Sequence, residues 1–172
     1  MKALLIFSWV LFAFTGCKSE KPINKQNQYL RWVGDSEYDS QLDDPDFSIC
    51  RTEEEVFQYF NLMEGPQYHG EKTALIKHFK THYKPVKNNT QSGYIRVRFV
   101  VNCKGEAGRF RVIQSDTAFK ETQFDKEIVN QLVTLTKEVE QWTIQYKNDA
   151  AVDYYQYLVF KINNGQIIEI LP

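Results

Sequence analysis

Two runs of alternating apolar and polar residues constrain the fold of this chain more than any other feature. The first run is Tyr94–Asn102 and the second is Arg109–Ser115, with the glycine-containing turn Cys103–Gly108 between them. Because successive side chains of a strand point to opposite faces of a sheet, each run has one apolar face. The pattern predicts an antiparallel hairpin. The face opposite the apolar residues carries four arginines: Arg96, Arg98, Arg109 and Arg111.

Segments with helical periodicity lie on both sides of this hairpin in the sequence. Glu71–Tyr83 gathers its apolar residues on one helical face and is followed by Pro85, which ends a helix. Phe124–Trp142 repeats apolar residues at helical spacing. A third strand is expected at Asp153–Ile162 and a short fourth strand at Gln166–Leu171. The order of helix, hairpin, helix and strand predicts an α+β fold.

The segment before the first helix is ambiguous. Thr52 and Glu55 have the spacing of a capping box and precede an apolar group, Val56, Phe57, Tyr59 and Phe60. A short helix or a strand would both fit this pattern.

The N-terminus has the features of a secretory leader. Lys2 is followed by the apolar run Ala3–Phe14, which is shorter than the ~20 residues that a membrane-spanning helix needs. The sequence from Phe14 to Cys17 is similar to the lipobox of bacterial lipoproteins. This resemblance implies that residues 1–16 are removed as a signal peptide and that Cys17 is lipidated, with palmitate among its acyl chains. The alternative is an ordinary signal peptide with an incidental cysteine.

Charge is segregated along the rest of the chain. The net charge is only −1, yet residues 71–120 contain eleven basic and three acidic residues. Residues 17–47 lack sustained periodicity and are rich in Asp, Ser, Asn and Gln, which predicts a flexible tether before a domain at 48–172. Because Lys18 is not acidic, we expect an anchor in the outer membrane, with the domain facing the periplasm.

Cys50 and Cys103 remain once the leader cysteine is set aside. In an oxidising envelope compartment, two such cysteines favour a disulfide over a catalytic or metal-binding role. Two separately buried thiols are the alternative, because sequence spacing does not show whether the residues meet.

Residues 70–172 resemble the C-terminal domain of TonB, the energy transducer of Gram-negative envelopes. The residues that carry the resemblance are Gly70–Leu75, Tyr83–Pro85, Gly93–Gly105, Val112, Ser115, Phe124, Asp125, Trp142 and the segment Tyr155–Ile162. The resemblance implies an antiparallel sheet of three to four strands with two helices packed on one face. It also implies a non-enzymatic module that receives an extended peptide of an outer-membrane transporter along a sheet edge.

In this chain the expected edge is Asp153–Ile162, with four candidate partner-binding residues: Tyr155, Tyr157, Val159 and Lys161. Two features depart from TonB. A cleavable lipoprotein signal replaces the transmembrane helix, and only Pro22 and Pro45 stand where the family has a long proline-rich spacer. Gln166–Leu171 could also fold back and cover the edge. We therefore expect a lipid-anchored protein that binds a partner without transmitting force.

The four arginines of the hairpin suggest a second function class, a structural or assembly scaffold that contacts partners through a basic sheet face. An acidic protein, an anionic lipid or a glycan would fit such a face. The alternatives are a solvated face or one partly covered by the acidic segment 35–55. Nucleic acid is not an expected partner, because no aromatic and basic motif of an RNA-binding sheet is present.

Catalytic and metal-binding motifs are missing from the sequence. His78 and His82 have a spacing that can place two imidazoles on one metal, but no third ligand accompanies them and Lys80 lies between them. No nucleophile with a matching base and no phosphate-binding loop is recognisable. We expect no enzymatic activity, no cofactor and no metal.

Overall fold

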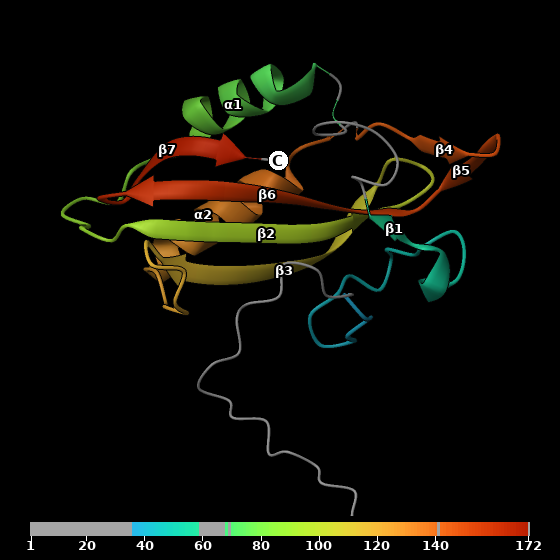
Figure 1. Ribbon diagram of the computed structural model, residues 1–172, viewed down its shortest axis with the longest axis horizontal. Helices are drawn as coiled ribbons and strands as arrows, with labels where there is room; N and C mark the ends of the chain where they lie inside the picture. The colour runs from blue at the N-terminus through green and yellow to red at the C-terminus, as the bar shows by residue number, and fades with distance from the viewer. Residues whose placement is uncertain (1–35, 59–67, 69, 141, 172) are drawn as a thin grey trace, which may run out of the picture.

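The computed structural model describes residues 36–58, 68, 70–140 and 142–171. A five-stranded sheet forms its centre (Figure 1). The strands of this sheet are β1 (Phe57–Gln58), β2 (Gly93–Val101), β3 (Ala107–Asp116), β6 (Tyr154–Asn163) and β7 (Gln166–Leu171). The helices are α1 (Glu71–His82) and α2 (Lys126–Lys137), and β4 (Gln145–Lys147) pairs with β5 (Ala150–Val152) in a separate ribbon. The α+β prediction is confirmed. None of the helices in the described ranges is long and apolar enough to cross a membrane.

The predicted hairpin is formed by β2 and β3. The two strands pair in antiparallel register from Gly93 opposite Asp116 to Val101 opposite Ala107. The register shifts between Arg98 and Val100, so that two residues of β3 lie opposite one residue of β2. This bulge contains Arg109, whose φ of 55° lies in the left-handed region that few residues other than glycine adopt.

The apolar face of β2 forms the core together with both helices. Phe79 of α1 and Ile128 and Leu132 of α2 are fully buried in the same cluster as Val97 and Phe99. Figure 1 shows α2 behind the sheet and α1 beside β7. The apolar residues that alternate along β2 and those that recur at helical spacing in α1 and α2 therefore pack into one core, as the sequence predicts.

The second helix is shorter than its apolar pattern suggests. Asp125 caps its N-terminus by accepting a hydrogen bond from the backbone N–H of Glu127, and the helix ends at Lys137. Val139 and Trp142 follow the helix and are still buried. Since Trp142 packs its ring on that of Phe99 with 4.8 Å between centroids, it contributes to the core from a non-helical segment.

Asp153–Ile162, the expected edge, lies inside the sheet, and Gln166–Leu171 covers part of it, which is the alternative that the sequence left open. On one side, β6 pairs with β2 along its length. On the other side, β1 pairs in parallel with Tyr154 and Tyr155, and β7 pairs in antiparallel register with Val159–Asn163. The side chains of Tyr155 and Val159 are also buried, each 2% exposed. The sheet also differs from the expected antiparallel sheet because β1 is parallel to its neighbour.

Part of the predicted tether packs against the domain. Residues 36–47 lie beside β3, in the blue segment of Figure 1, and residues 48–58 continue to β1. The leader and Cys17 lie outside the described residues, so the signal peptide and the lipid anchor stay predictions.

Candidate partner-binding surfaces

We call the sheet face opposite the helices the arginine face, after Arg96, Arg98, Arg109 and Arg111, and residues 36–55 the acidic strap. Two arginines of this face bind carboxylates of the acidic strap through both terminal guanidinium nitrogens. Arg109 Nη1 and Nη2 donate to Glu53 at 2.7 and 2.9 Å. Arg111 Nη1 and Nη2 donate to Asp43 at 2.6 and 2.7 Å. Of the alternatives that the sequence left open for this face, partial cover by the acidic segment is the one observed, at Arg109 and Arg111.

These ion pairs shift the pKa of Asp43 and of both arginines. The hydrogen bond from Arg111, more than any other influence, lowers the pKa of the Asp43 carboxyl. The carboxylates of Glu53 and Asp43 raise the pKa of Arg109 and Arg111, respectively. Because two-nitrogen pairing fixes the orientation of each guanidinium, the contact is specific in geometry as well as in charge.

The other two arginines are buried within the arginine face. Arg96 is 4% exposed and Arg98 is 7% exposed. The guanidinium carbon of Arg98 lies 4.2 Å from the centre of the Tyr155 ring, a cation–π contact. Burial lowers the pKa of Arg96. Neither arginine is therefore a solvent-exposed charge.

An aromatic residue of the acidic strap lies directly over a glycine of β3. A Cβ atom built on Gly108 would come within 2.2 Å of the Phe47 ring, so a larger residue at this position would exclude the ring. The backbone carbonyl oxygen of Glu37 accepts a hydrogen bond of 2.8 Å from Arg111. One stretch of the acidic strap thus packs an aromatic ring on Gly108 and supplies oxygen acceptors to Arg111.

A disulfide joins Cys50 of the acidic strap to Cys103 in the turn after β2, with 6.0 Å between the Cα atoms. The predicted pairing is confirmed. Asp153 lies beside it, fully buried. Its Oδ2 accepts hydrogen bonds from the backbone N–H groups of Cys50 and Arg51 at 2.9 and 3.1 Å, and its Oδ1 accepts one from Cys103 at 2.9 Å.

Asp153 was not recognised from the sequence. Its only signal is an acidic residue at the start of a run that is otherwise apolar and aromatic. The Sγ atoms of Cys50 and Cys103 and a carboxylate oxygen of Asp153 lie within 4.8 Å of one another, which is close enough for shared metal ligation. The two sulfurs are bonded to each other, and the carboxylate already binds three N–H groups. The cluster therefore has a structural role here.

A groove lies between α1 and β7, a strand at one edge of the sheet. Among the strands in the described ranges, β7 pairs with β6 alone. The groove has a volume of about 220 Å³ and is lined by Lys72, Ile76, Lys80 and the segment Ile167–Ile170. Ile168 is 52% exposed. Lys161, one of the predicted partner-binding residues, forms a 3.9 Å ion pair with Glu169 of β7.

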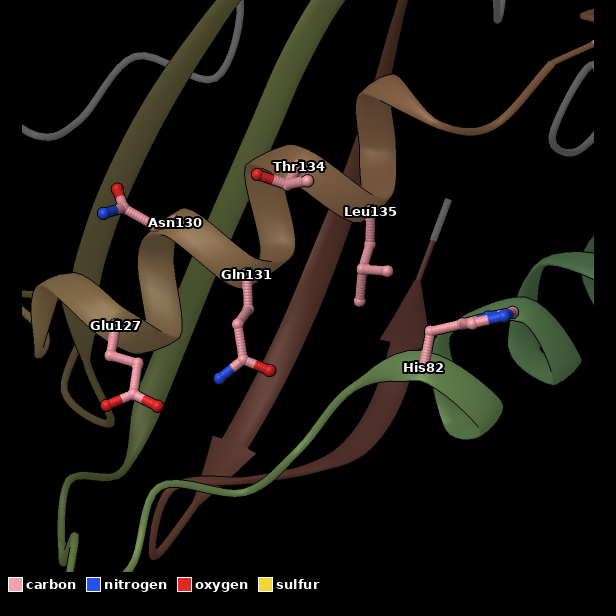
Figure 2. Close-up of a pocket in the computed structure, with 6 residues that line it drawn as sticks. All are labelled: His82, Glu127, Asn130, Gln131, Thr134 and Leu135. Atoms are coloured by element: carbon pink, nitrogen blue, oxygen red, sulfur yellow. The ribbon is translucent and has the colours of Figure 1, made fainter.

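A second depression, of about 500 Å³, lies between α2 and the end of α1 (Figure 2). It is lined by His82, Glu127, Asn130, Gln131, Thr134 and Leu135. In Figure 2 the His82 ring points away from the α2 side chains. A nitrogen of His82 bonds the backbone carbonyl of His78 at 2.8 Å, and a nitrogen of His78 bonds that of Leu135 at 2.9 Å. The two histidines thus support the helices, and the lining side chains do not converge on a reaction centre.

Comparisons of the chain with protein-family models, with curated proteins and with solved structures find no match. The resemblance of residues 70–172 to the TonB C-terminal domain therefore remains a prediction based on the residues that carry it.

Proposed function

We propose that this protein is a lipid-anchored envelope protein without enzymatic activity. In this proposal it binds a partner protein by adding an extended segment of the partner to β7. The observation that carries the proposal is the edge position of β7, which pairs with one neighbour among the described strands. The N–H and C=O groups on the outer edge of such a strand can form a ladder with an added peptide. The resemblance to TonB supports a peptide of an outer-membrane transporter as the partner.

The groove supports a particular kind of segment. Ile76 and Ile168 provide apolar surface, and Lys72 and Lys80 of α1 flank it with positive charge. An extended peptide with alternating apolar residues and nearby carboxylates would complement this lining. The edge of β6 that the sequence suggested is paired with β1 and β7, so we place the contact with the partner on β7 instead.

Photo-crosslinking in intact cells tests this proposal. A photoreactive amino acid at Ile168 should capture a partner, and the double charge reversal K72E/K80E should reduce the yield at least tenfold. The matched control is K77E, an exposed lysine of α1 that does not line the groove. If K72E/K80E captures as much partner as the native protein, or if K77E reduces capture equally, binding in the α1–β7 groove is refuted.

The alternative function, a scaffold that contacts partners through an open basic face, has less support. In the described conformation Arg109 and Arg111 already bind Glu53 and Asp43. Such a scaffold would first have to displace the acidic strap.

A further inference from the structure

The two halves of the acidic strap are held in different ways. Cys50 is covalently bound to Cys103, and the backbone that follows it is fixed by Asp153 and by the pairing of β1 with β6. Residues 36–49 are not part of any strand in the described chain. Side chains and isolated carbonyl groups connect this half to the sheet, as they would connect a bound peptide. We call residues 36–49 the arm.

Two anchors of the arm dominate its contact with the sheet. The Asp43 side chain is 1% exposed and binds Arg111 through both carboxylate oxygens. The Phe47 ring lies over Gly108, four residues further along the arm. An arginine paired with a buried carboxylate and a packed aromatic ring are contacts of the kind that often dominate the energy of protein interfaces.

The receiving side of this contact belongs to the sheet. Gly108 and Arg109 lie at the bulge of β3, and the bulge follows from the register of β2 with β3. Arg109 has a left-handed φ of 55°, a strained conformation for a residue with a side chain, which the surrounding structure must compensate. Strain of this kind is concentrated at binding and catalytic sites. Because the bulge is built by strand pairing, the site would persist if the arm left it.

We infer that the end of the arginine face around Gly108 and Arg111 is a binding site for an extended acidic segment of a partner protein, and that the arm occupies it as an internal ligand. The partner segment would carry a carboxylate and, four residues later, an aromatic ring, as Asp43 and Phe47 do. Such a site is separate from the α1–β7 groove and does not depend on strand addition.

Tethering makes the arm a strong competitor. A segment linked through a short chain acts at an effective concentration on the order of 1 mM. If the arm as a free segment binds the site with a dissociation constant of about 10 µM, its tethered form weakens the binding of any partner peptide roughly 100-fold. Partner binding is therefore expected to be weak until the arm is weakened or displaced.

The test uses a fluorescein-labelled peptide with the sequence of residues 36–49, which contains no cysteine. Fluorescence anisotropy measures its binding to the mature full-length protein. The variant D43N/F47A, which removes both anchors of the arm, should bind the peptide at least tenfold more tightly than the native protein. The matched control D44N/S48A changes exposed neighbours and should bind as weakly as the native protein.

Two further variants test the receiving side. Adding Arg111→Ala or Gly108→Ala to D43N/F47A should abolish peptide binding, because the first removes the cation and the second fills the place of the ring. K72E/K80E in the same background should leave peptide binding unchanged, which separates this site from the α1–β7 groove.

Two results would overturn the inference. In the first, D43N/F47A still unfolds cooperatively in urea and binds the peptide no more tightly than the native protein. The arm would then be a fixed part of the fold. In the second, a peptide that itself carries D43N and F47A binds the opened protein equally well. The contact would then be unspecific electrostatic attraction.

Discussion

Loss of the disulfide should remove a large share of the stability of this protein. Cys50 and Cys103 are separated by 53 residues in the sequence. The loop-closure relation for a cross-link of this length gives an entropy of about 14 cal/mol/K, or about 4 kcal/mol at 25 °C. Domains of this size unfold with a free energy of roughly 5–15 kcal/mol, so the double variant C50S/C103S should remain folded with about 1–11 kcal/mol left.

Equilibrium unfolding in urea measures this loss. With an m value of roughly 1–3 kcal/mol/M, a loss of about 4 kcal/mol lowers the unfolding midpoint by more than 1 M. Dithiothreitol added to the native protein should cause a similar loss, and it should change nothing further in C50S/C103S. This comparison separates the effect of the cross-link from that of the serine side chains.

A loss below about 1 kcal/mol would refute the reasoning. The segment that contains Cys50 would then unfold independently of the sheet, and closing the loop would contribute nothing to the cooperative transition. The contacts of Asp153 with the backbone of Cys50 and Cys103 argue against this outcome, because they connect the same two segments without the sulfur bond.

Four other changes have defined outcomes. Asp153→Asn should lower the free energy of unfolding in urea by about 2–3 kcal/mol, since one buried carboxylate accepts three N–H groups, and an unchanged midpoint would contradict this role. The pKa of Asp43 is lowered below its usual 3.8, so the ionised carboxylate contributes its full share of the free energy of unfolding above that pH. This share is lost as the pH falls through the lowered pKa. Asp43→Asn should therefore abolish this part of the acid dependence of unfolding in urea. Burial raises the pKa of Tyr83 from 10.0 to about 12, so stability should fall as the pH rises between these values, and Tyr83→Phe should remove that fall. Cys17→Ser should prevent incorporation of labelled palmitate in cells, and equal labelling of the variant would refute the lipobox prediction.

Local patterns were sufficient to predict the elements of the core. Val97 and Phe99 alternate with Arg96 and Arg98, and strand geometry turns this alternation into one apolar face. The helix boundaries were less accurate at the end of α2. The burial of Trp142 comes from its contact with Phe99 and not from helical periodicity, which a one-dimensional pattern does not distinguish.

The candidate sites depended on contacts between distant segments. The β6 edge was misassigned because its free side is closed by β7, which follows directly, and by β1, which precedes it by about a hundred residues. Segregation of charge suggested that acidic and basic segments meet. It did not show that Asp43 pairs with Arg111 and that Glu53 pairs with Arg109.

The sequence by itself determined the helices, the hairpin and the existence of an arginine-rich face, because these follow from the spacing of residues within one segment. Only the tertiary structure decided that β7, like β3, is an edge strand, that Arg109 and Arg111 are covered and that Asp153 joins the acidic strap to the turn after β2. These features depend on which segments come together when the chain folds, and residue spacing does not encode that choice.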